Sequence, residues 1–365
     1  MFVGLYNITE FKKNEDGFNA SVHFNSSHFI YKAHFPDNPV TPGVCIIQIA
    51  KELLEYHYGC TYVMNRASNV KYINIIDPRY DSDVVYGVKC SRIGKLVKAT
   101  IVVSTSDKIF VKISMECSEE DIFEKLKIYL LVPTYNNATK LGGVLDSLLT
   151  YTSRIIVVND GSTDNTLEVL NSYSDKITII NYAKNRGKGY AIKQGFKRCK
   201  ELGGNYLISL DSDGQHMASD LVGFVEAIKK NQDAIIIGGR KLENENKQAK
   251  SLFANKFANF WFKVQTLQTC RDTQSGYRLY PIRKIGNINF FTNRYEFELE
   301  VLVRAAWKNI SIITIPINVY YPPEKERITH FRPVVDFARI SLLNTILCVV
   351  AIFYGYPSML IRKIF

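Results

Sequence analysis

Five short apolar runs alternate with amphipathic stretches in the second part of the chain, at residues 128–132, 154–159, 177–181, 206–210 and 234–237. Strands that alternate with helices usually pair in parallel, because each helix carries the chain back to the starting edge of the sheet. The alternation therefore predicts an α/β domain with a mainly parallel sheet covered by helices. Ligands of such sheets bind beyond the carboxyl ends of the strands, so the polar residues that follow the runs are the first candidates for a site.

Polar residues directly follow three of these runs. The sequence reads Pro-Thr-Tyr-Asn-Asn at 133–137, Asp-Gly-Ser-Thr-Asp at 160–164 and Asp-Ser-Asp-Gly-Gln-His at 211–216. Two carboxylates spaced by two residues on a turn, as in Asp211 and Asp213, can hold a divalent cation and leave ligand positions for diphosphate oxygens. One such pair is usually a solvated turn, but three clusters at three strand ends predict one shared ligand site.

Further motifs accompany these clusters, namely Asn185-Arg186-Gly187-Lys188-Gly189, Gln215-His216, Gly239-Arg240 and Asp272-Thr273-Gln274-Ser275-Gly276-Tyr277-Arg278. In this order they resemble the motifs of family 2 glycosyltransferases with the GT-A fold, and within that family the dolichyl-phosphate mannosyltransferase-like branch. The resemblance implies a Rossmann-like α/β domain. It also implies the transfer of a hexose from a nucleotide-diphosphate donor with inversion of configuration.

The resemblance gives roles to individual residues. Residues expected against the nucleotide are Pro133, Tyr135 and Asp160, and residues expected around a Mg or Mn ion are Asp211, Asp213 and Gln215. Lys188 is expected among the donor-binding residues, and Arg240 and Lys250 are expected at the donor phosphates. In a late basic loop, Arg327 and Arg332 are further candidates for the donor phosphates, with lipid head groups as their alternative partners. Cations are needed at the phosphates because negative charge grows on the leaving diphosphate in the transition state. Glycine at 187 and 189 would let the backbone approach the ligand closely.

Two acidic residues, Glu298 and Glu300, are the candidates for a catalytic base. They stand just before a helical run at 301–307 and would point in different directions if that helix already includes them. A hydroxyl acceptor needs a base to take its proton, whereas a phosphate acceptor is already ionised. Two acceptors stay open, a polyprenyl phosphate and a hydroxyl on an acyl or polyene chain.

The first part of the chain has a different pattern. Residues 42–58 have apolar positions at helical spacing behind Pro42, and strand-like runs follow between 61 and 115. This predicts an α+β domain with one helix against a largely antiparallel sheet. The string His34-Phe35-Pro36-Asp37-Asn38-Pro39-Val40-Thr41-Pro42-Gly43-Val44 resembles the signature of hot-dog-fold 3-hydroxyacyl-ACP dehydratases.

That second resemblance implies a second site. In the dehydratases the histidine removes the proton next to a thioester and a backbone N–H at the helix start binds the carbonyl oxygen, which gives these roles to His34 and Gly43. The family also uses a carboxylic acid one turn into the helix, where this chain has Gln48, and an amide cannot give up a proton at neutral pH. An active dehydratase and an acyl-binding or dimer-forming module both stay open. Acyl carrier protein is a candidate partner, and a homodimer through the hot-dog domain is expected.

Charge also divides the chain into two parts. The formal charge is +11, with 14 basic and 15 acidic residues through Lys125 and 32 basic and 20 acidic residues after it. The excess accompanies the diphosphate motifs without an aromatic-basic RNA motif, so the expected partners are a nucleotide sugar and a membrane surface rather than nucleic acid. We expect domains at 1–120 and 128–339 with a linker at 121–127.

The tail from 340 to 361 has no formal charge and is long enough to cross a bilayer as a helix. Gly355, Tyr356 and Pro357 interrupt it, so a shallowly inserted segment and a buried helix packed on the catalytic domain or a second subunit are the alternatives. Met1 to Glu10 lacks the features of a signal peptide, and the seven cysteines are scattered. We therefore expect the enzyme at the cytoplasmic face of the membrane, with reduced thiols.

Other functions compete with this interpretation. A sugar-nucleotide pyrophosphorylase would need a glycine- and arginine-rich loop after the first strand, which the sequence lacks. A binding protein with two degenerate sites would not need the carboxylates at 211 and 213. The fusion with a hot-dog domain favours the acyl or polyene hydroxyl as acceptor and suits a bacterial lipid or pigment pathway. It also permits an acyl-ACP-binding or dehydratase protein in which glycosyl transfer is secondary.

Overall fold

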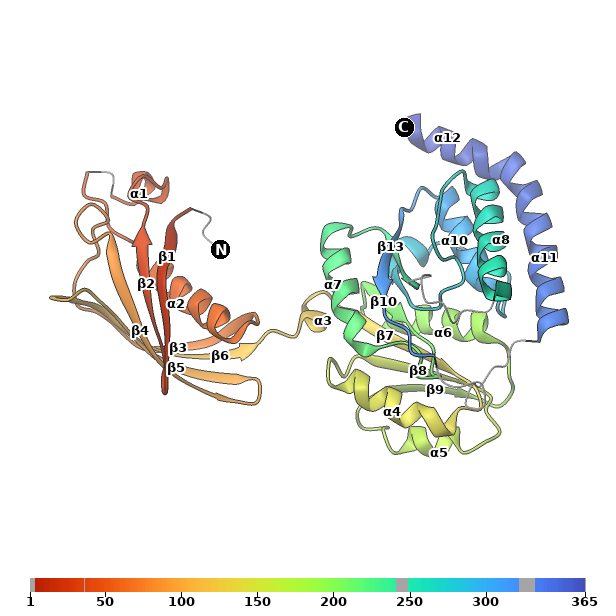
Figure 1. The fold of residues 1–365 in the computed structure, drawn as a ribbon, viewed down its shortest axis with the longest axis horizontal. Helices are drawn as coiled ribbons and strands as arrows, with labels where there is room; N and C mark the ends of the chain where they lie inside the picture. The colour runs from red at the N-terminus through yellow and green to blue at the C-terminus, as the bar shows by residue number, and fades with distance from the viewer. Residues whose placement is uncertain (1–3, 36, 241–248, 322–331, 365) are drawn as a thin grey trace. The chain divides into compact units, whose positions relative to one another are not determined.

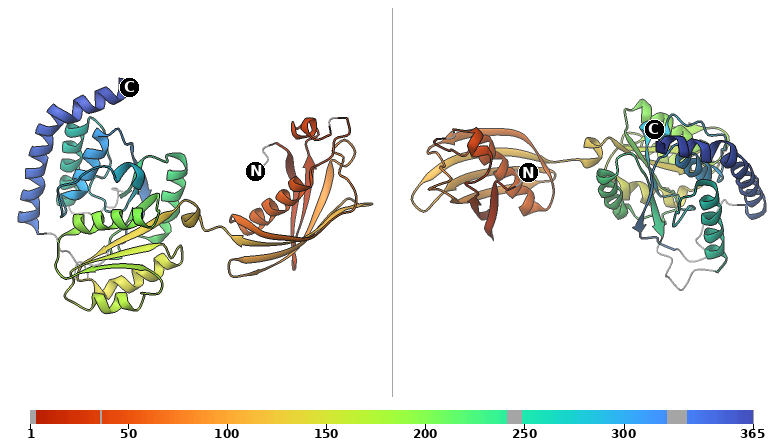
Figure 2. Two further views of the ribbon diagram at one scale, coloured as in Figure 1. Left: turned by 180° about the vertical axis from the view of Figure 1, so that it is seen from behind. Right: turned by 90° about the horizontal axis from the view of Figure 1, so that it is seen from above.

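The computed structural model describes residues 4–35, 37–240, 249–321 and 332–364. The chain forms two compact units, Met1–Asp121 and Ile122–Phe365 (Figures 1 and 2). A short helix, α3 (Ile122–Lys125), occupies much of the stretch that the sequence suggested as a linker.

The first unit is a six-stranded antiparallel sheet with one long helix against it (Figure 1). Its strands lie in the order β1-β2-β4-β5-β6-β3, with bounds β1 (Tyr6–Asn14), β2 (Gly17–Phe24), β3 (Tyr62–Tyr72), β4 (Asp83–Ile93), β5 (Leu96–Ser104) and β6 (Ile109–Glu119). A single helical turn, α1 (Ile30–Ala33), precedes the long helix α2 (Gly43–Tyr58). The buried face of α2, which includes Ile46, Ile49 and Leu53, packs into the sheet core. This is the predicted hot-dog arrangement.

The second unit is built on a mixed seven-stranded sheet in the order β13-β11-β12-β10-β7-β8-β9. Its strands are β7 (Ile128–Thr134), β8 (Ile155–Asp160), β9 (Thr178–Tyr182), β10 (Tyr206–Ser209), β11 (Ile235–Arg240), β12 (Arg278–Pro281) and β13 (Ile312–Ile317). All five predicted apolar runs are strands, which confirms the α/β fold. The sequence did not predict β12, which is antiparallel to β10 and β11, or β13.

Two cores cover the two faces of this sheet, because successive side chains of a strand point to opposite sides. On one face, Leu130 and Val132 pack with helices α4 (Ala138–Leu149), α5 (Thr166–Asn171) and α7 (Leu221–Lys230). On the other face, Leu131 packs with α6 (Lys188–Glu201), α8 (Ala249–Thr266) and α10 (Phe297–Trp307). The two short helical turns η1 (Ala218–Asp220) and α9 (Ile282–Ile285) lie in the connections.

Three consecutive helical segments end the chain, α11 (Pro333–Val350), the π-helical turn η3 (Ala351–Gly355) and α12 (Tyr356–Ile364). Among the described residues, one stretch, Val335–Ile361, is long and apolar enough to cross a membrane by length and composition. Its inner side reaches the α8 and α10 layer, where Leu347 and Ala351 join the core.

Candidate active site

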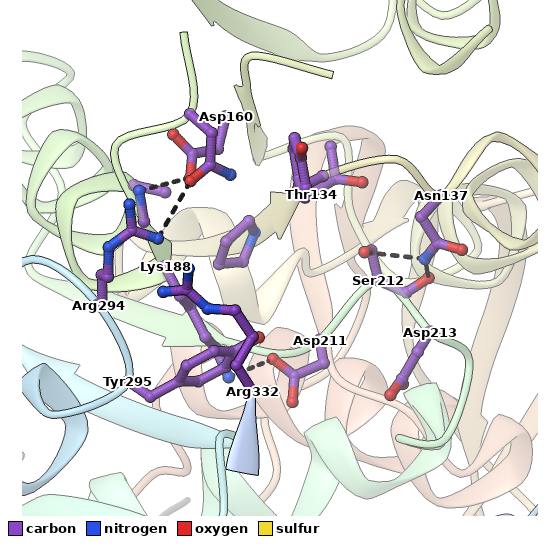
Figure 3. A pocket seen from close by; sticks show the side chains of 15 residues that line it. Thr134, Asn137, Asp160, Lys188, Asp211, Ser212, Asp213, Arg294, Tyr295 and Arg332 are labelled. Carbon is purple, nitrogen blue, oxygen red and sulfur yellow. Dashed lines mark hydrogen bonds and ion pairs between the residues drawn. The ribbon is translucent and has the colours of Figure 1, made fainter. Parts of the chain in front are cut away.

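A cavity of about 520 Å³ lies at the carboxyl ends of β7, β8 and β10, as expected for a parallel sheet (Figure 3). It is lined by residues of those strand ends, of the start of α6 and of two later segments, namely Pro133, Thr134, Tyr135, Asn137, Asp160, Asn185, Gly187, Lys188, Ala191, Asp211, Ser212, Asp213, Arg294, Tyr295 and Arg332. The predicted residues among them are Pro133, Tyr135, Asp160, Lys188, Asp211, Asp213 and Arg332. The structure therefore brings seven predicted side chains from five places in the sequence to one cavity.

The loops that carry these residues are tied together by their own polar side chains. The Asn137 Nδ2 group donates hydrogen bonds to the carbonyl oxygen of Ser212 at 2.5 Å and to its Oγ at 3.0 Å. The backbone N–H of Asn136 donates to Oγ of Ser162 at 2.9 Å. The turn after β7 thus fixes both the turn after β8 and the acidic turn after β10.

The two aspartates of the acidic turn have different surroundings. Asp211 forms an ion pair with Lys188 Nζ at 2.6 Å, and although burial acts the other way, this ammonium holds the pKa of Asp211 below its ordinary value. Burial, with the nearby Asp211 charge, raises the pKa of Asp213. The Asp213 carboxylate accepts a hydrogen bond from the backbone N–H of Gln215 at 3.0 Å. His216 accepts one from the N–H of Asp211 at 3.2 Å through Nδ1, and burial lowers its pKa.

This turn has the chemistry that a divalent cation needs. Mg and Mn take oxygen ligands and leave several positions for water or phosphate, and two neighbouring carboxylates on the cavity wall supply such oxygens. Burial and the charge of Asp211 raise the pKa of Asp213, and a bound cation would relieve the repulsion between the two carboxylates. Within the described ranges, no cluster of three or more His, Cys, Asp or Glu side chains is placed to hold a metal. The side chain of Gln215 is not among the cavity-lining groups.

Lys188, the first residue of α6, bridges two acids at the cavity wall. Its ammonium lies 2.6 Å from Asp211 and 2.9 Å from Oε1 of Glu298. Burial alone would lower the pKa of Lys188, but the two carboxylates outweigh it and raise the pKa. Gly276 makes room for this bridge, since a Cβ atom there would lie 2.8 Å from Asp211 Oδ2 and 2.9 Å from Lys188 Nζ. The predicted phosphate ligand is therefore also the link between the acidic turn and α10.

Glu298 and Glu300 do point in different directions on α10. Glu300 is buried and accepts hydrogen bonds from the backbone N–H groups of Phe291 and Thr292 at 2.9 to 3.2 Å. It also pairs with Arg304 at 3.4 Å. Glu300 holds the loop before α10 and does not line the cavity. Glu298 reaches the cavity region only through its ion pair with Lys188.

Asp160 fixes the loop that opens α6. Its two carboxylate oxygens each accept a hydrogen bond of 2.7 Å, from the backbone N–H groups of Arg186 and Gly187. Burial raises the pKa of Asp160, although these hydrogen bonds and the Arg294 charge oppose the shift. Asp160 lies on the cavity wall, as predicted for a nucleotide contact, and it also carries the loop (Figure 3).

The glycines at 187 and 189 serve packing within the chain. A Cβ atom on Gly187, which has φ 102°, would lie 2.5 Å from Cγ of Arg294. A Cβ atom on Gly189 would lie 2.3 Å from Cβ of Phe297. These glycines therefore let the segment before α10 cross the start of α6, and Gly187 also lines the cavity. Their role in admitting the ligand stays a prediction.

Of the other predicted phosphate ligands, Arg240 is described and lies outside the cavity lining. It is held by Asp272 through two hydrogen bonds of 2.6 and 2.8 Å. Lys250 is in the first turn of α8, but its side chain, like the whole of Arg327, lies outside the described residues. The cavity is also lined by Arg332, predicted in the same loop as Arg327, and by Arg294, which sequence reasoning missed. The available signal for Arg294 was weak, a basic and aromatic pair next to the acidic start of α10.

The dehydratase-like site of the first unit has the histidine and the glycine of the family signature but has Gln48 in the place of the acid. His34 Nδ1 lies 2.9 Å from the carbonyl oxygen of Val40, which orients the ring. Gly43 is the first residue of α2, and a Cβ atom there would lie 2.3 Å from the hydroxyl of Tyr72. Gln48 Nε2 donates to Glu52 Oε1 at 3.0 Å, and Glu52 also accepts a hydrogen bond of 2.7 Å from the hydroxyl of Tyr6.

Comparison with known proteins agrees with this geometry. Residues 129–286 match Glycosyl transferase family 2, and residues 10–97 match the ApeI dehydratase family. A dolichyl-phosphate beta-glucosyltransferase of Homo sapiens is 31% identical over 220 residues, which cover 53% of this chain and 67% of that protein. The chain belongs to glycosyl transferase family 2. Its second unit is a GT-A glycosyltransferase domain, and its first is an ApeI-like hot-dog domain.

Other relatives lie at similar distances. A dolichyl-phosphate beta-glucosyltransferase of Trichomonas vaginalis is 31% identical over 223 residues, 54% of this chain and 67% of the relative. A UDP-N-acetylglucosamine–dolichyl-phosphate N-acetylglucosaminyltransferase of Methanococcus voltae is 27% identical, covering 53% of this chain and 86% of the relative. Among solved structures, glucosyl-3-phosphoglycerate synthase of Mycobacterium tuberculosis, in complex with Mn²⁺, UDP-glucose and phosphoglyceric acid, matches with 14% identity and a TM-score of 0.47, covering 64% of this chain and 82% of that one. The matched segments span about two thirds of the length of the two glucosyltransferases.

Proposed function

We propose that the second unit transfers a hexose, with inversion, from a nucleotide-diphosphate donor to a polyprenyl phosphate in a divalent-metal-dependent reaction. The observation that carries the proposal is the cavity at the strand ends, where Asp211 and Asp213 face the cations Lys188, Arg294 and Arg332. A pair of carboxylates surrounded by cations suits a ligand that is itself a diphosphate with a metal ion. The proposed domain bounds are 1–120 and 128–339, with 121–127 between them.

The residues of the cavity divide the work by their chemistry. Pro133, Tyr135 and Asp160 form the wall beside the ends of β7 and β8, where we place the nucleotide base. Asp211 and Asp213 would hold the cation, which when bound neutralises charge on the leaving diphosphate. Arg294 and Arg332 are fixed cations on the same cavity wall and stabilise the same developing charge without a metal.

The arrangement of the acids favours a phosphate acceptor over a hydroxyl. Glu300 is buried under backbone hydrogen bonds, and Glu298 already forms an ion pair with Lys188. Neither is a base available to an acceptor hydroxyl, and an ionised phosphate needs none. The relatives named as dolichyl-phosphate transferases support the same choice. An acyl or polyene hydroxyl, suggested by the fused hot-dog domain, is the alternative.

For the first unit we propose acyl-group binding without dehydration. Gln48 stands where the dehydratases have an acid, and it donates to Glu52, which Tyr6 also engages. Gly43 begins α2, and His34 follows α1 and is hydrogen-bonded to the carbonyl oxygen of Val40 in the segment that leads to α2. Both would hold a thioester, with acyl carrier protein as the candidate donor. Active dehydration is the alternative. A homodimer through this unit and a position on the cytoplasmic face of the membrane complete the proposal.

The decisive experiment is a transfer assay with the full-length protein. It combines UDP-glucose, UDP-N-acetylglucosamine and GDP-mannose in turn with a polyprenyl phosphate and with Mg²⁺ or Mn²⁺, and detects the glycolipid by mass spectrometry. Asp213→Asn should lower transfer by about 100-fold or more, since it removes a cation ligand. Asp233→Asn, at an exposed ion pair with Lys284, is the matched control and should keep full activity. Full activity of Asp213→Asn, or of the wild type in EDTA, would refute the metal assignment.

A further inference from the structure

The C-terminal helices have a feature that sugar transfer does not use, a buried side and an exposed side of different chemistry. Buried positions recur three or four residues apart at Asn344, Leu347, Ala351, Gly355 and Met359. In a helix this spacing makes one stripe, and the stripe continues through the π-helical turn into α12. Leu347, Ala351 and Met359 pack in the core that includes α8 and α10.

Polar contacts fix the inner stripe to α8. Nε2 of Gln265 donates a hydrogen bond to Oδ1 of Asn344 at 2.8 Å, and both side chains are buried. The hydroxyl of Tyr356 donates to the carbonyl oxygen of Val264. Breaking these contacts would leave buried amide groups without partners, which is unfavourable in protein and more so in lipid.

Contacts with the end of α10 extend the same attachment. Oγ of Ser358 donates to the carbonyl oxygen of Trp307 at 3.1 Å, and Trp307 Nε1 donates to the carbonyl oxygen of Gln265 at 2.8 Å. A Cβ atom on Gly355 would lie 2.4 Å from Trp307 Nε1, so the π-helical turn lies directly on the indole. The three segments are therefore part of the catalytic unit (Figures 1 and 2).

The opposite side is apolar and exposed. Side chains between 50 and 79% exposed are Leu342, Ile346, Val349, Ile352, Phe353, Leu360 and Ile361. No residue from Ser341 to Ile361 carries a formal charge. Single exposed apolar residues are scattered over the surface of ordinary soluble proteins. A continuous row of them along one helix face instead marks an interaction surface.

We propose that this outer face lies flat on a lipid surface and that the helices do not cross the bilayer. A crossing would have to detach the inner stripe or carry α8 into the hydrocarbon with its exposed Lys256 and Lys263. A flat position buries the outer side chains and leaves every inner hydrogen bond in place. The exposed Arg339 on α11 suits acidic lipid head groups.

The choice of lipid over a second copy of this chain rests on the proposed lipid-linked acceptor and on the position of Arg332. Arg332 lines the active-site cavity and directly precedes Pro333, the first residue of α11. Its backbone N–H donates a hydrogen bond of 2.7 Å to the buried Asp336 of α11. The cavity wall and the lipid-facing helix are thus one continuous piece of chain, so an acceptor phosphate can enter while its hydrocarbon tail stays in the lipid.

The first experiment measures flotation of the full-length protein with sealed vesicles of phosphatidylcholine and phosphatidylglycerol. The wild type should float, and the double change Ile352→Asp with Phe353→Asp should lower the vesicle-bound fraction by about tenfold or more, since each side chain loses its transfer into lipid. Ile93→Asp, at an equally exposed apolar residue of the first unit, is the control and should float like the wild type. A wild type that stays with the soluble fraction, or that self-associates through this face instead, would overturn the proposal.

The second experiment tests whether the C-terminal helices lie on the vesicle surface or cross the bilayer. A peptide tag placed after Phe365 should be cut completely by protease added outside vesicle-bound protein, whereas a protected tag would mean that the helices cross. Asn344→Leu should lower the Tm without raising the bound fraction. More binding at an unchanged Tm would contradict the docked position. A wild-type protein that floats with vesicles but transfers no sugar would refute the proposed function and leave the proposed lipid contact standing.

Discussion

At the scale of single residues, the cavity is organised by one lysine between two acids. Lys188 Nζ pairs with Asp211 and Glu298, and Gly276 lies against the first of these pairs. Sequence motifs identified Lys188 and Asp211, because both belong to motifs that resemble those of family 2 glycosyltransferases. The pairing with Glu298 could not be predicted, because Glu298 lies on α10, 110 positions after Lys188.

The same reason explains why Arg294 was missed. It reaches the cavity by crossing the start of α6, and its guanidinium lies near Asn185, 109 positions earlier in the chain. Nothing in the residues around 294 encodes that crossing. Glu300 shows the converse. The sequence offered it as one of two candidates for a catalytic base, whereas in the structure its buried carboxylate accepts hydrogen bonds from the backbone of the loop before α10.

Gly276→Ala should disrupt the lysine bridge without unfolding the domain. The added Cβ would meet Asp211 Oδ2 and Lys188 Nζ at less than 3 Å, so both groups must shift. We expect kcat/KM for transfer to fall by about 10- to 100-fold, the usual consequence of moving a reactive group by about 1 Å. Gly143→Ala in α4, where a Cβ has no neighbour within 4 Å, is the control. Unchanged transfer by Gly276→Ala would show that the bridge does not matter for the reaction.

Replacing the two glutamates should separate a structural role from a chemical one. Glu300→Ala removes the acceptor of the backbone N–H groups of Phe291 and Thr292 and the partner of Arg304, which should cost about 1–3 kcal/mol of unfolding free energy. Glu298→Gln keeps the shape of the side chain and should leave the Tm nearly unchanged. Urea unfolding measures the first effect and the transfer assay the second. If Glu298→Gln abolished transfer at every pH, Glu298 would be the catalytic base. The acceptor would then be a hydroxyl and not a phosphate.

At the scale of elements, apolar runs predicted the strands that are long and fully buried. The strands β7, β8 and β11 are such runs, and each was recognised. Strand β12 was not recognised, because it begins with the buried Arg278, which the sequence offered only as part of a polar motif. Its guanidinium donates to the carbonyl oxygens of Thr273, Ser275 and Glu298, a tertiary arrangement that local sequence does not reveal.

The packing of α6 on α10 is the element contact on which the cavity depends. Gly189→Ala would place a Cβ 2.3 Å from that of Phe297 and push the start of α10 away, together with Arg294 and Tyr295. We expect weaker donor binding, by about tenfold, and a lower Tm, since overpacking typically costs about 1–3 kcal/mol. Thermal unfolding with and without a nucleotide sugar measures both effects, the Tm of the free protein and the rise in Tm on donor binding. A normal shift on addition of donor would show that the cavity tolerates movement of α10.

At the scale of the whole molecule, composition predicted two units with different partners. The positive excess after Lys125 accompanies the cavity cations and the lipid-facing helices, whereas the first unit is nearly neutral. The sequence also identified residues 340–361 as a stretch suited to lipid. It could not decide whether this stretch crosses the bilayer, lies on its surface or packs against protein. That choice depends on Gln265 and Trp307, which lie outside the stretch and hold its inner side.

Two separate folding units should have separable functions, and reciprocal variants test this. His34→Ala removes the proposed thioester contact in the first unit and should keep kcat/KM for sugar transfer within about twofold, because each unit has a hydrophobic core of its own and independent sites act additively. Asp213→Asn should abolish transfer and keep the binding of an acyl thioester analogue, followed by calorimetry. A large loss of transfer in His34→Ala with an unchanged Tm would show that the acyl site supplies or positions the acceptor. The two chemistries would then be coupled within one chain.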